Sequence, residues 1–256
     1  LSNYITGLGF GTSSRKRMQT YWPCDLHLVG KDIARFHAVI WPAMLLSAEL
    51  PLPKRILVHG HIHSGGKKMS KTLGNVIDPL AVVDDYGADA LRLALLFGTT
   101  PGTDPIISEE KIRGMRNFTT KLWNIARYIG MSIDDQTKAE FVPTTDNDAR
   151  IKHQLDQLIE QTTTDLDGFS LHLALERLYH FIWHDLADNY IEVTKDHLQN
   201  EATRASTQGN LLYVLKVSLV LLQPFAPFVT EAIWQELFPI GTALMNSSWP
   251  KPSNKE

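Results

Sequence analysis

The chain has 256 residues, 43% of them hydrophobic and 21% charged, and these shares are typical of a globular protein with a packed core. It holds one cysteine, Cys24, so no disulfide framework and no four-cysteine zinc site can form, and a reducing, cytoplasmic compartment is favoured. The apolar runs are too short to span a bilayer, so we expect no membrane association.

The net charge of −3 hides an uneven distribution of charged residues. Residues 1–75 hold ten lysines and arginines against three acidic residues, whereas the remainder holds fifteen against twenty-five. A positive field over the first part suits a polyphosphate or an RNA backbone. An ordinary solvated surface explains the same charges, and on charge alone it is the better explanation.

The first part of the chain predicts a parallel β-α-β unit. The expected elements are a strand at 25–29, a helix at 33–48 and a second strand at 56–62. This order and spacing are typical of two parallel strands joined by a crossover helix. Ligand-binding loops lie at the carboxyl ends of such strands, which here are residues 30–32 and 65–72.

The rest of the chain predicts helices. Asp78 followed by Pro79 is a typical helix start, and Ser108 before two glutamates is another. Helices are expected at about 79–86, 88–97, 108–129, 148–165, 171–198, 211–222 and 228–238. Polar linkers separate them, which is typical of an antiparallel helix bundle.

The strongest motif is the basic, glycine-containing segment from Gly65 to Asn75. Glycines let backbone N–H groups approach phosphate closely, and lysine ammonium groups can neutralise charge that develops on a polyphosphate. A basic surface turn is the plain alternative for two glycines followed by two lysines. The whole pentapeptide Lys68-Met69-Ser70-Lys71-Thr72 after a strand is much more specific.

That pentapeptide resembles the Lys-Met-Ser-Lys-Ser signature of class I aminoacyl-tRNA synthetases, and Thr72 keeps a hydroxyl at the last position. The resemblance implies that Lys68, Ser70 and Lys71 are catalytic. Lys68 and Lys71 would stabilise the ATP phosphates during adenylate formation, with Lys71 the more important, and Met69 and Ser70 would shape the loop. It implies Mg²⁺ only through the nucleotide, because no residue set in the sequence would hold the ion independently.

The residues before the pentapeptide resemble the methionyl-type enzymes. The resemblance runs over 3–6, 22–37 and 41–48. It implies that Gly30 and Asp32 approach the ATP ribose and that His59 and Gly60 lie beside the adenine. It also implies a methionine side-chain pocket, lined by Tyr4, Ile33 and His37.

Plainer roles are open for the histidines. Without the resemblance, His37 reads as a buried histidine satisfied by a neighbour. The alternating His59, His61 and His63 suggest a metal site, but no carboxylate or cysteine is spaced to complete it, so none is expected.

Beyond residue 75 the chain resembles the valyl-type enzymes and their isoleucyl and leucyl relatives. The segments that carry this resemblance are 76–80, 86–92, 98–102, 116–124, 181–185, 224–234 and 244–250. The fold class expected is therefore α/β then all-α. Residues 1–104 would form the second half of a Rossmann-type catalytic domain, and residues 105–256 a helical anticodon-binding domain.

The resemblance implies an aminoacyl-tRNA ligase, with ATP, tRNA and an amino acid as partners and methionine favoured. Valine, or a leucyl or isoleucyl relative, is the alternative, and a non-catalytic tRNA-binding module is the third hypothesis. On the basic helix after Ser108, the tRNA contacts expected are Lys111, Arg113, Arg116 and Lys121. The family's His-Ile-Gly-His motif is not in this sequence, which also starts without methionine, so we expect a missing N-terminal catalytic half and little activity of this chain alone.

Overall fold

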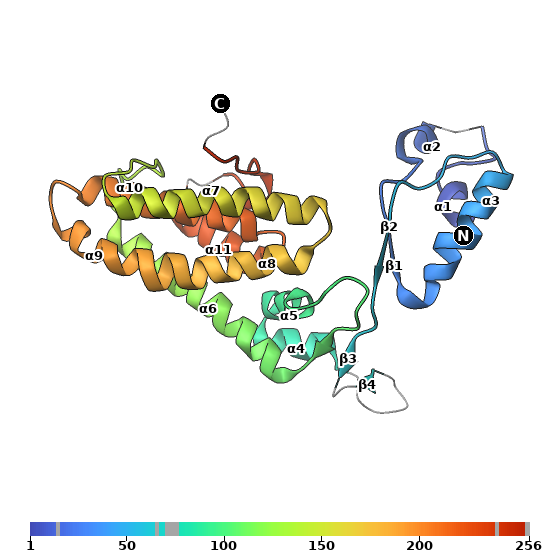
Figure 1. Cartoon of the computed structure of the whole chain (residues 1–256), viewed down its shortest axis with the longest axis horizontal. Coiled ribbons are helices and arrows are strands. Elements are labelled where there is room, and N and C mark those ends of the chain that lie inside the picture. The colour runs from blue at the N-terminus through green and yellow to red at the C-terminus, as the bar shows by residue number, and fades with distance from the viewer. Residues whose placement is uncertain (14–15, 65–66, 70–76, 239–240, 254–256) are drawn as a thin grey trace. The chain divides into compact units, whose positions relative to one another are not determined.

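The computed structural model describes residues 1–13, 16–64, 67–69, 77–238 and 241–253 (Figure 1). Two compact units are present. The first consists of Leu1–Met69 and Thr100–Ile106, and the second of Ser70–Thr99 and Ile107–Glu256. The chain therefore leaves the first unit after Met69, returns to it for seven residues, and leaves it again.

The first unit contains the expected pair of parallel strands. β1 (His27–Gly30) and β2 (Ile56–His59) pair so that Gly30 lies opposite His59. The helix expected over 33–48 is present as one continuous helical stretch of changing type, in which a 3₁₀ turn, Lys31–Ile33, leads into a π-helical turn, Phe36–Ile40, and then α3 (Trp41–Ser47). Pro42 explains the π-helical turn, because it has no N–H to donate and its ring would clash with the carbonyl four residues earlier in a regular α-helix.

A small apolar cluster covers this crossover. Ile5, Trp22, Trp41 and Leu45 are buried together. Ile5 comes from α1 (Asn3–Thr6), and α2 (Lys16–Tyr21) precedes Trp22. These two short helices were not expected from the sequence, because neither is long enough to show a helical repeat of apolar residues.

Short strands follow β2. β3 (His63–Ser64) pairs antiparallel with β4 (Lys67–Lys68), so that His63 lies opposite Lys68. β5 (Ile106–Ile107) lies on the other side of β3. The second strand expected over 56–62 is therefore shorter, because β2 ends at His59 and residues 60–62 belong to no strand before β3 begins.

The second unit is helical, as predicted. Its helices are α4 (Pro79–Tyr86), α5 (Ala88–Leu96), α6 (Glu109–Ser132), α7 (Asp146–Asp167), α8 (Leu171–His180), α9 (Ile191–Gln199), α10 (Arg204–Leu222) and α11 (Pro227–Leu237). A π-helical segment, Phe181–Tyr190, joins α8 to α9, so the long helix expected over 171–198 is continuous. The Asp78 carboxylate accepts from the Leu80 N–H and Ser108 Oγ from the Lys111 N–H, which confirms both predicted caps.

α10 is the central helix of the bundle. By length and composition it could cross a membrane, but most of it is buried inside the bundle, as in the core helix of a packed protein. It begins seven residues before the start expected at Leu211. The expectation was late because the first turns of the helix are polar and carry no apolar repeat. There Asn210 bonds the N–H and the carbonyl of Val142, and Gln208 donates to the Ser132 carbonyl.

A buried carboxylate fixes the start of α7. Asp148 is 3% exposed and accepts hydrogen bonds from the Tyr190 hydroxyl, at 2.6 Å, and from the backbone and hydroxyl groups of Thr144 and Thr145. Burial raises the pKa of Asp148, but the hydrogen bonds outweigh it, so the pKa lies below its ordinary value. Tyr190 therefore ties the π-helical segment to the N-terminus of α7.

Tyr190→Phe should reduce the free energy of unfolding by about 2 kcal/mol, because it removes a hydrogen bond to a buried charge. Because the folded pKa of Asp148 is depressed, this contribution is present above about pH 4 and is lost as the pH falls through the folded value. Urea unfolding at neutral and acidic pH measures both effects. The same substitution at the half-buried Tyr213 is the control, and an equal cost there would contradict the assignment.

Candidate functional site

The carboxyl ends of β1 and β2 bring together three residues that the sequence assigned to ATP. A Cβ atom at Gly30 would lie 2.8 Å from Asp32 Oδ1 and 3.6 Å from His59 Cε1. Glycine at this position therefore lets a carboxylate and an imidazole approach the same strand end. Such an edge is where parallel α/β sheets bind ligands.

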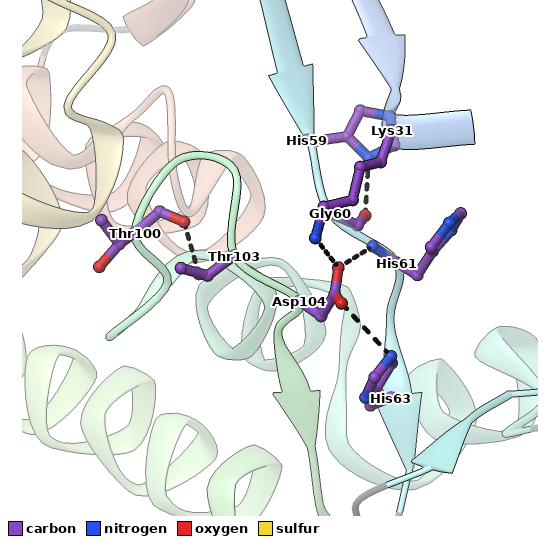
Figure 2. Close-up of polar contacts among 8 residues, drawn as sticks. All are labelled: Lys31, His59, Gly60, His61, His63, Thr100, Thr103 and Asp104. Carbon is purple, nitrogen blue, oxygen red and sulfur yellow. Dashed lines mark hydrogen bonds and ion pairs between the residues drawn. The ribbon is translucent and has the colours of Figure 1, made fainter. Parts of the chain in front are cut away.

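Gly60, the fourth of these residues, is buried against the segment that returns from the second unit. A Cβ atom there would lie 2.0 Å from the carbonyl oxygen of Thr103, closer than any real contact. The backbone of Gly60 also accepts from His59 Nδ1 at 3.0 Å (Figure 2). The close approach of residues 103–104 thus explains this glycine without a ligand.

Asp104 is the charged residue at this contact, and sequence reasoning missed it. Its Oδ1 accepts from the His61 N–H at 2.9 Å and from Lys31 Nζ at 3.1 Å, and its Oδ2 is 3.7 Å from His63 Nε2 (Figure 2). The His61 hydrogen bond, followed by Lys31, holds the pKa of Asp104 below its ordinary value. Asp104 is 43 residues from His61 and 73 from Lys31, so no local pattern could have shown the contact.

The three residues assigned to the amino-acid pocket also come together. The Tyr4 hydroxyl is 2.8 Å from His37 Nε2, and His37 Nδ1 is 2.9 Å from the Ile33 carbonyl oxygen. Because a carbonyl only accepts, Nδ1 carries a hydrogen and donates it to Ile33, while Nε2 faces the tyrosine hydroxyl. His37 is buried and satisfied, whereas Tyr4 and Ile33 are each 41% exposed and offer an open apolar wall.

A second histidine lies behind this wall and was not singled out in the sequence. The His27 ring is buried, with its centroid 4.6 Å from Tyr4 and 5.5 Å from His37, and Cys24 Sγ is 3.5 Å from its Nε2. Burial, and then the neighbouring His37, lower the pKa of His27. The wall therefore rests on an imidazole that is neutral at physiological pH.

The lysine-rich pentapeptide is described only at its start. The backbone of Lys68 forms part of β4, and the Met69 N–H donates to the Ile62 carbonyl at 3.4 Å. Ser70, Lys71 and Thr72 lie outside the described residues, as does the side chain of Lys68. Within the described part of the chain, no three histidine, cysteine or acidic side chains are arranged to hold a metal ion.

The four basic residues expected to contact tRNA differ in their surroundings on α6. Lys121 pairs with Asp188 at 2.6 Å and lies 4.5 Å from the Trp183 ring centroid. Burial lowers the pKa of Lys111. Arg113 and Arg116 are exposed, and Arg116 donates to the Asp85 carbonyl. The two arginines are therefore the more accessible cations of the set.

Two family models match the chain, and together they span both units. Residues 1–127 match "tRNA synthetases class I (M)" and residues 148–256 match "Anticodon-binding domain of tRNA ligase". The fold is thus a Rossmann-like α/β part with a helical anticodon-binding bundle, as predicted. The chain belongs to the class I aminoacyl-tRNA synthetases.

The known proteins that this chain resembles are named for two different amino acids, valine and methionine. Valine--tRNA ligases of Carboxydothermus hydrogenoformans and Bacillus subtilis are each 38% identical, over 92% and 95% of this chain and 27% and 28% of their own length. Mycobacterium tuberculosis methionyl-tRNA synthetase in complex with methionyl-adenylate superposes with a TM-score of 0.80 and 32% identity, covering 96% of this chain and 54% of that one. The chain spans about a quarter of the valine relatives and half of the methionyl structure.

These findings confirm the mixed resemblance seen in the sequence, with a methionyl-type first part and a bundle of the type shared by valyl, isoleucyl and leucyl enzymes. The methionyl-type match continues to residue 127, beyond the change expected near residue 75.

His27 should titrate below its ordinary pKa of about 6.5, because burial disfavours the imidazolium. The unfolded chain then binds the proton more readily, so the stability of the first unit falls as the pH drops below that value. NMR titration of the histidine rings measures the pKa. Tyr4→Ala uncovers the ring and should raise the pKa, whereas Tyr21→Ala, at a tyrosine 64% exposed, is the control. A His27 pKa at or above 6.5 would contradict the assignment.

Proposed function

We propose that this chain is part of an aminoacyl-tRNA ligase, which activates an amino acid with ATP and transfers it to tRNA in cytoplasmic protein synthesis. The observation that carries the proposal is the meeting of Gly30, Asp32 and His59 at the end of a parallel strand pair. The β3–β4 pair, from which the lysine-rich pentapeptide continues, belongs to the same unit. This combination suits a nucleotide with its phosphates toward the lysines.

The proposed roles follow the chemistry of adenylate formation. An oxygen of the amino-acid carboxylate attacks the α-phosphorus of ATP, and pyrophosphate leaves with its Mg²⁺. Lys68, Ser70 and Lys71 stabilise the charge on the phosphates, with Met69 shaping the loop. Asp32 accepts hydroxyl groups of the ribose beside Gly30, and His59 and Gly60 flank the adenine.

We propose methionine as the amino acid. The wall formed by Tyr4, Ile33 and His37 is largely apolar, and the polar groups of its tyrosine and histidine bond within the wall. Such a wall suits a flexible, polarisable thioether. It belongs to the part of the chain that matches the methionyl-type family model. Valine is the alternative, supported by the 38% identity to valine--tRNA ligases, and a leucyl or isoleucyl specificity is a weaker one.

Exposed apolar side chains on the first unit support the proposal that a further catalytic segment packs against it. Leu28, Val39 and Leu46 are each at least 60% exposed on the first unit. An exposed apolar surface of this kind suits contact with another segment of protein. We propose that the first half of the catalytic domain, on the same polypeptide, covers it.

The full-length protein should catalyse ATP–pyrophosphate exchange with methionine, with a kcat/KM at least about 100-fold above that for valine. Tyr4→Ala should raise the KM for methionine about tenfold, because it opens one wall of the pocket. The chain of 256 residues alone should exchange at a negligible rate. A preference for valine would favour the alternative, and near-normal exchange by the chain alone would contradict the need for a partner segment.

The bundle is proposed to bind tRNA through α6. Arg113→Glu and Arg116→Glu should each weaken tRNA binding about tenfold and reduce its dependence on salt, because each removes a phosphate contact. Arg150→Glu, an exposed arginine on α7, is the matched control. Binding that is equally weakened by all three changes would argue against a specific surface on α6. Normal tRNA binding without exchange activity in the full-length protein would favour the non-catalytic module.

A further inference from the structure

We infer that Asp104 is a positioning residue of the nucleotide site, which fixes Lys31 and the start of the β3–β4 pair. The inference rests on the proposed function for its link to ATP. Its structural part rests on contacts within the first unit alone.

One carboxylate joins three separate segments. Asp104 Oδ1 accepts from the His61 N–H, which follows β2, and from Lys31 Nζ, which follows β1 (Figure 2). Asp104 Oδ2 faces His63 of β3. A single side chain therefore contacts the ends of both parallel strands, β1 and β2, and the first strand of the β3–β4 pair.

The backbone around Asp104 is docked as well. The Pro105 carbonyl accepts from the His63 N–H at 2.8 Å, and the Thr103 carbonyl lies against Gly60. Thr103 is itself held in a local turn, since both its N–H and its hydroxyl donate to the Thr100 carbonyl. Residues 100–105 thus present Asp104 on a fixed support.

The opposite ends of the same strands carry a comparison pair. Lys54 and Asp25 form an ion pair of 2.6 Å just before β2 and β1 begin. The Asp25 side chain is 87% exposed, whereas that of Asp104 is 29% exposed and also accepts a backbone N–H. An exposed pair of this kind contributes little, but a carboxylate that also closes a backbone contact can set local geometry.

The consequence is specific to the nucleotide. Lys31 lies between Gly30 and Asp32 in sequence, and its ammonium group is held toward Asp104. Without Asp104, that ammonium group and the His61 N–H both lose this carboxylate as an acceptor, at the edge where ATP is proposed to bind. The wall of Tyr4, Ile33 and His37 makes its own contacts and keeps them.

Amide hydrogen exchange of the full-length protein tests the structural part. Asp104→Ala should accelerate exchange at His61 and His63 by at least about tenfold, because the local structure opens more often. Gly60→Ala should act in the same direction by displacing Thr103. Asp104→Asn keeps an oxygen for the His61 N–H and should stay near the parent rate, and Asp25→Ala is the matched control. Unchanged exchange in Asp104→Ala, or equal acceleration in Asp25→Ala, would overturn the inference.

Steady-state exchange kinetics test the link to ATP. Asp104→Ala should raise the KM for ATP about tenfold and leave the KM for the amino acid within about twofold, because only the nucleotide edge loses its support. Asp104→Asn should have an intermediate effect, since it loses only the charge beside Lys31. Equal changes in both KM values would overturn this positioning role. A parent protein without any exchange activity would instead refute the proposed function, and amide exchange would still decide whether Asp104 holds the three segments.

Discussion

The parallel pairing of β1 with β2 is the constraint on which the candidate site depends. Parallel strands end at the same edge, so Gly30 and His59 lie opposite each other although 28 residues separate them. The crossover between them carries Ile33 and His37, which meet Tyr4 on the wall of the proposed amino-acid pocket. Loss of this register would disrupt both groups at once, the residues proposed to bind the nucleotide and those proposed to bind the amino acid.

The chain around the lysine-rich pentapeptide is held on both sides by polar contacts. Before it, Asp104 and Pro105 hold His61 and His63 in the first unit. After it, in the second unit, α5 is bound to the N-terminus of α11, where the Asp89 carboxylate accepts from the Phe228 and Val229 N–H groups. The buried Asp89 specifies one arrangement of α5 and α11, because any other would leave its carboxylate buried without partners.

The sequence was most informative where one short segment carries the signal. Local spacing predicted the helices of the bundle, the caps Asp78 and Ser108, and the strand that ends at Gly30. It also named Gly30, Asp32 and His59, which the strand ends bring together. It missed Asp104, because that residue acts across 43 to 73 residues of sequence.

Other parts of the fold could not be predicted for physical reasons. The first turns of α10 are polar, and side-chain hydrogen bonds to other segments hold them in the bundle. Apolar spacing therefore placed the start of that helix too late. The π-helical turn that precedes α3 and Pro42 is a backbone effect that apolar spacing does not show. The role of Gly60 depends on Thr103, which only the folded chain brings close.

A crystal structure of the full-length protein with a non-hydrolysable ATP analogue and Mg²⁺ would show whether the ends of β1 and β2 bind the nucleotide. We expect the ribose beside Gly30 and Asp32, the adenine against His59 and the phosphates toward Lys68 and Lys71. A nucleotide bound elsewhere, or a strand edge that stays empty at saturating analogue, would contradict it.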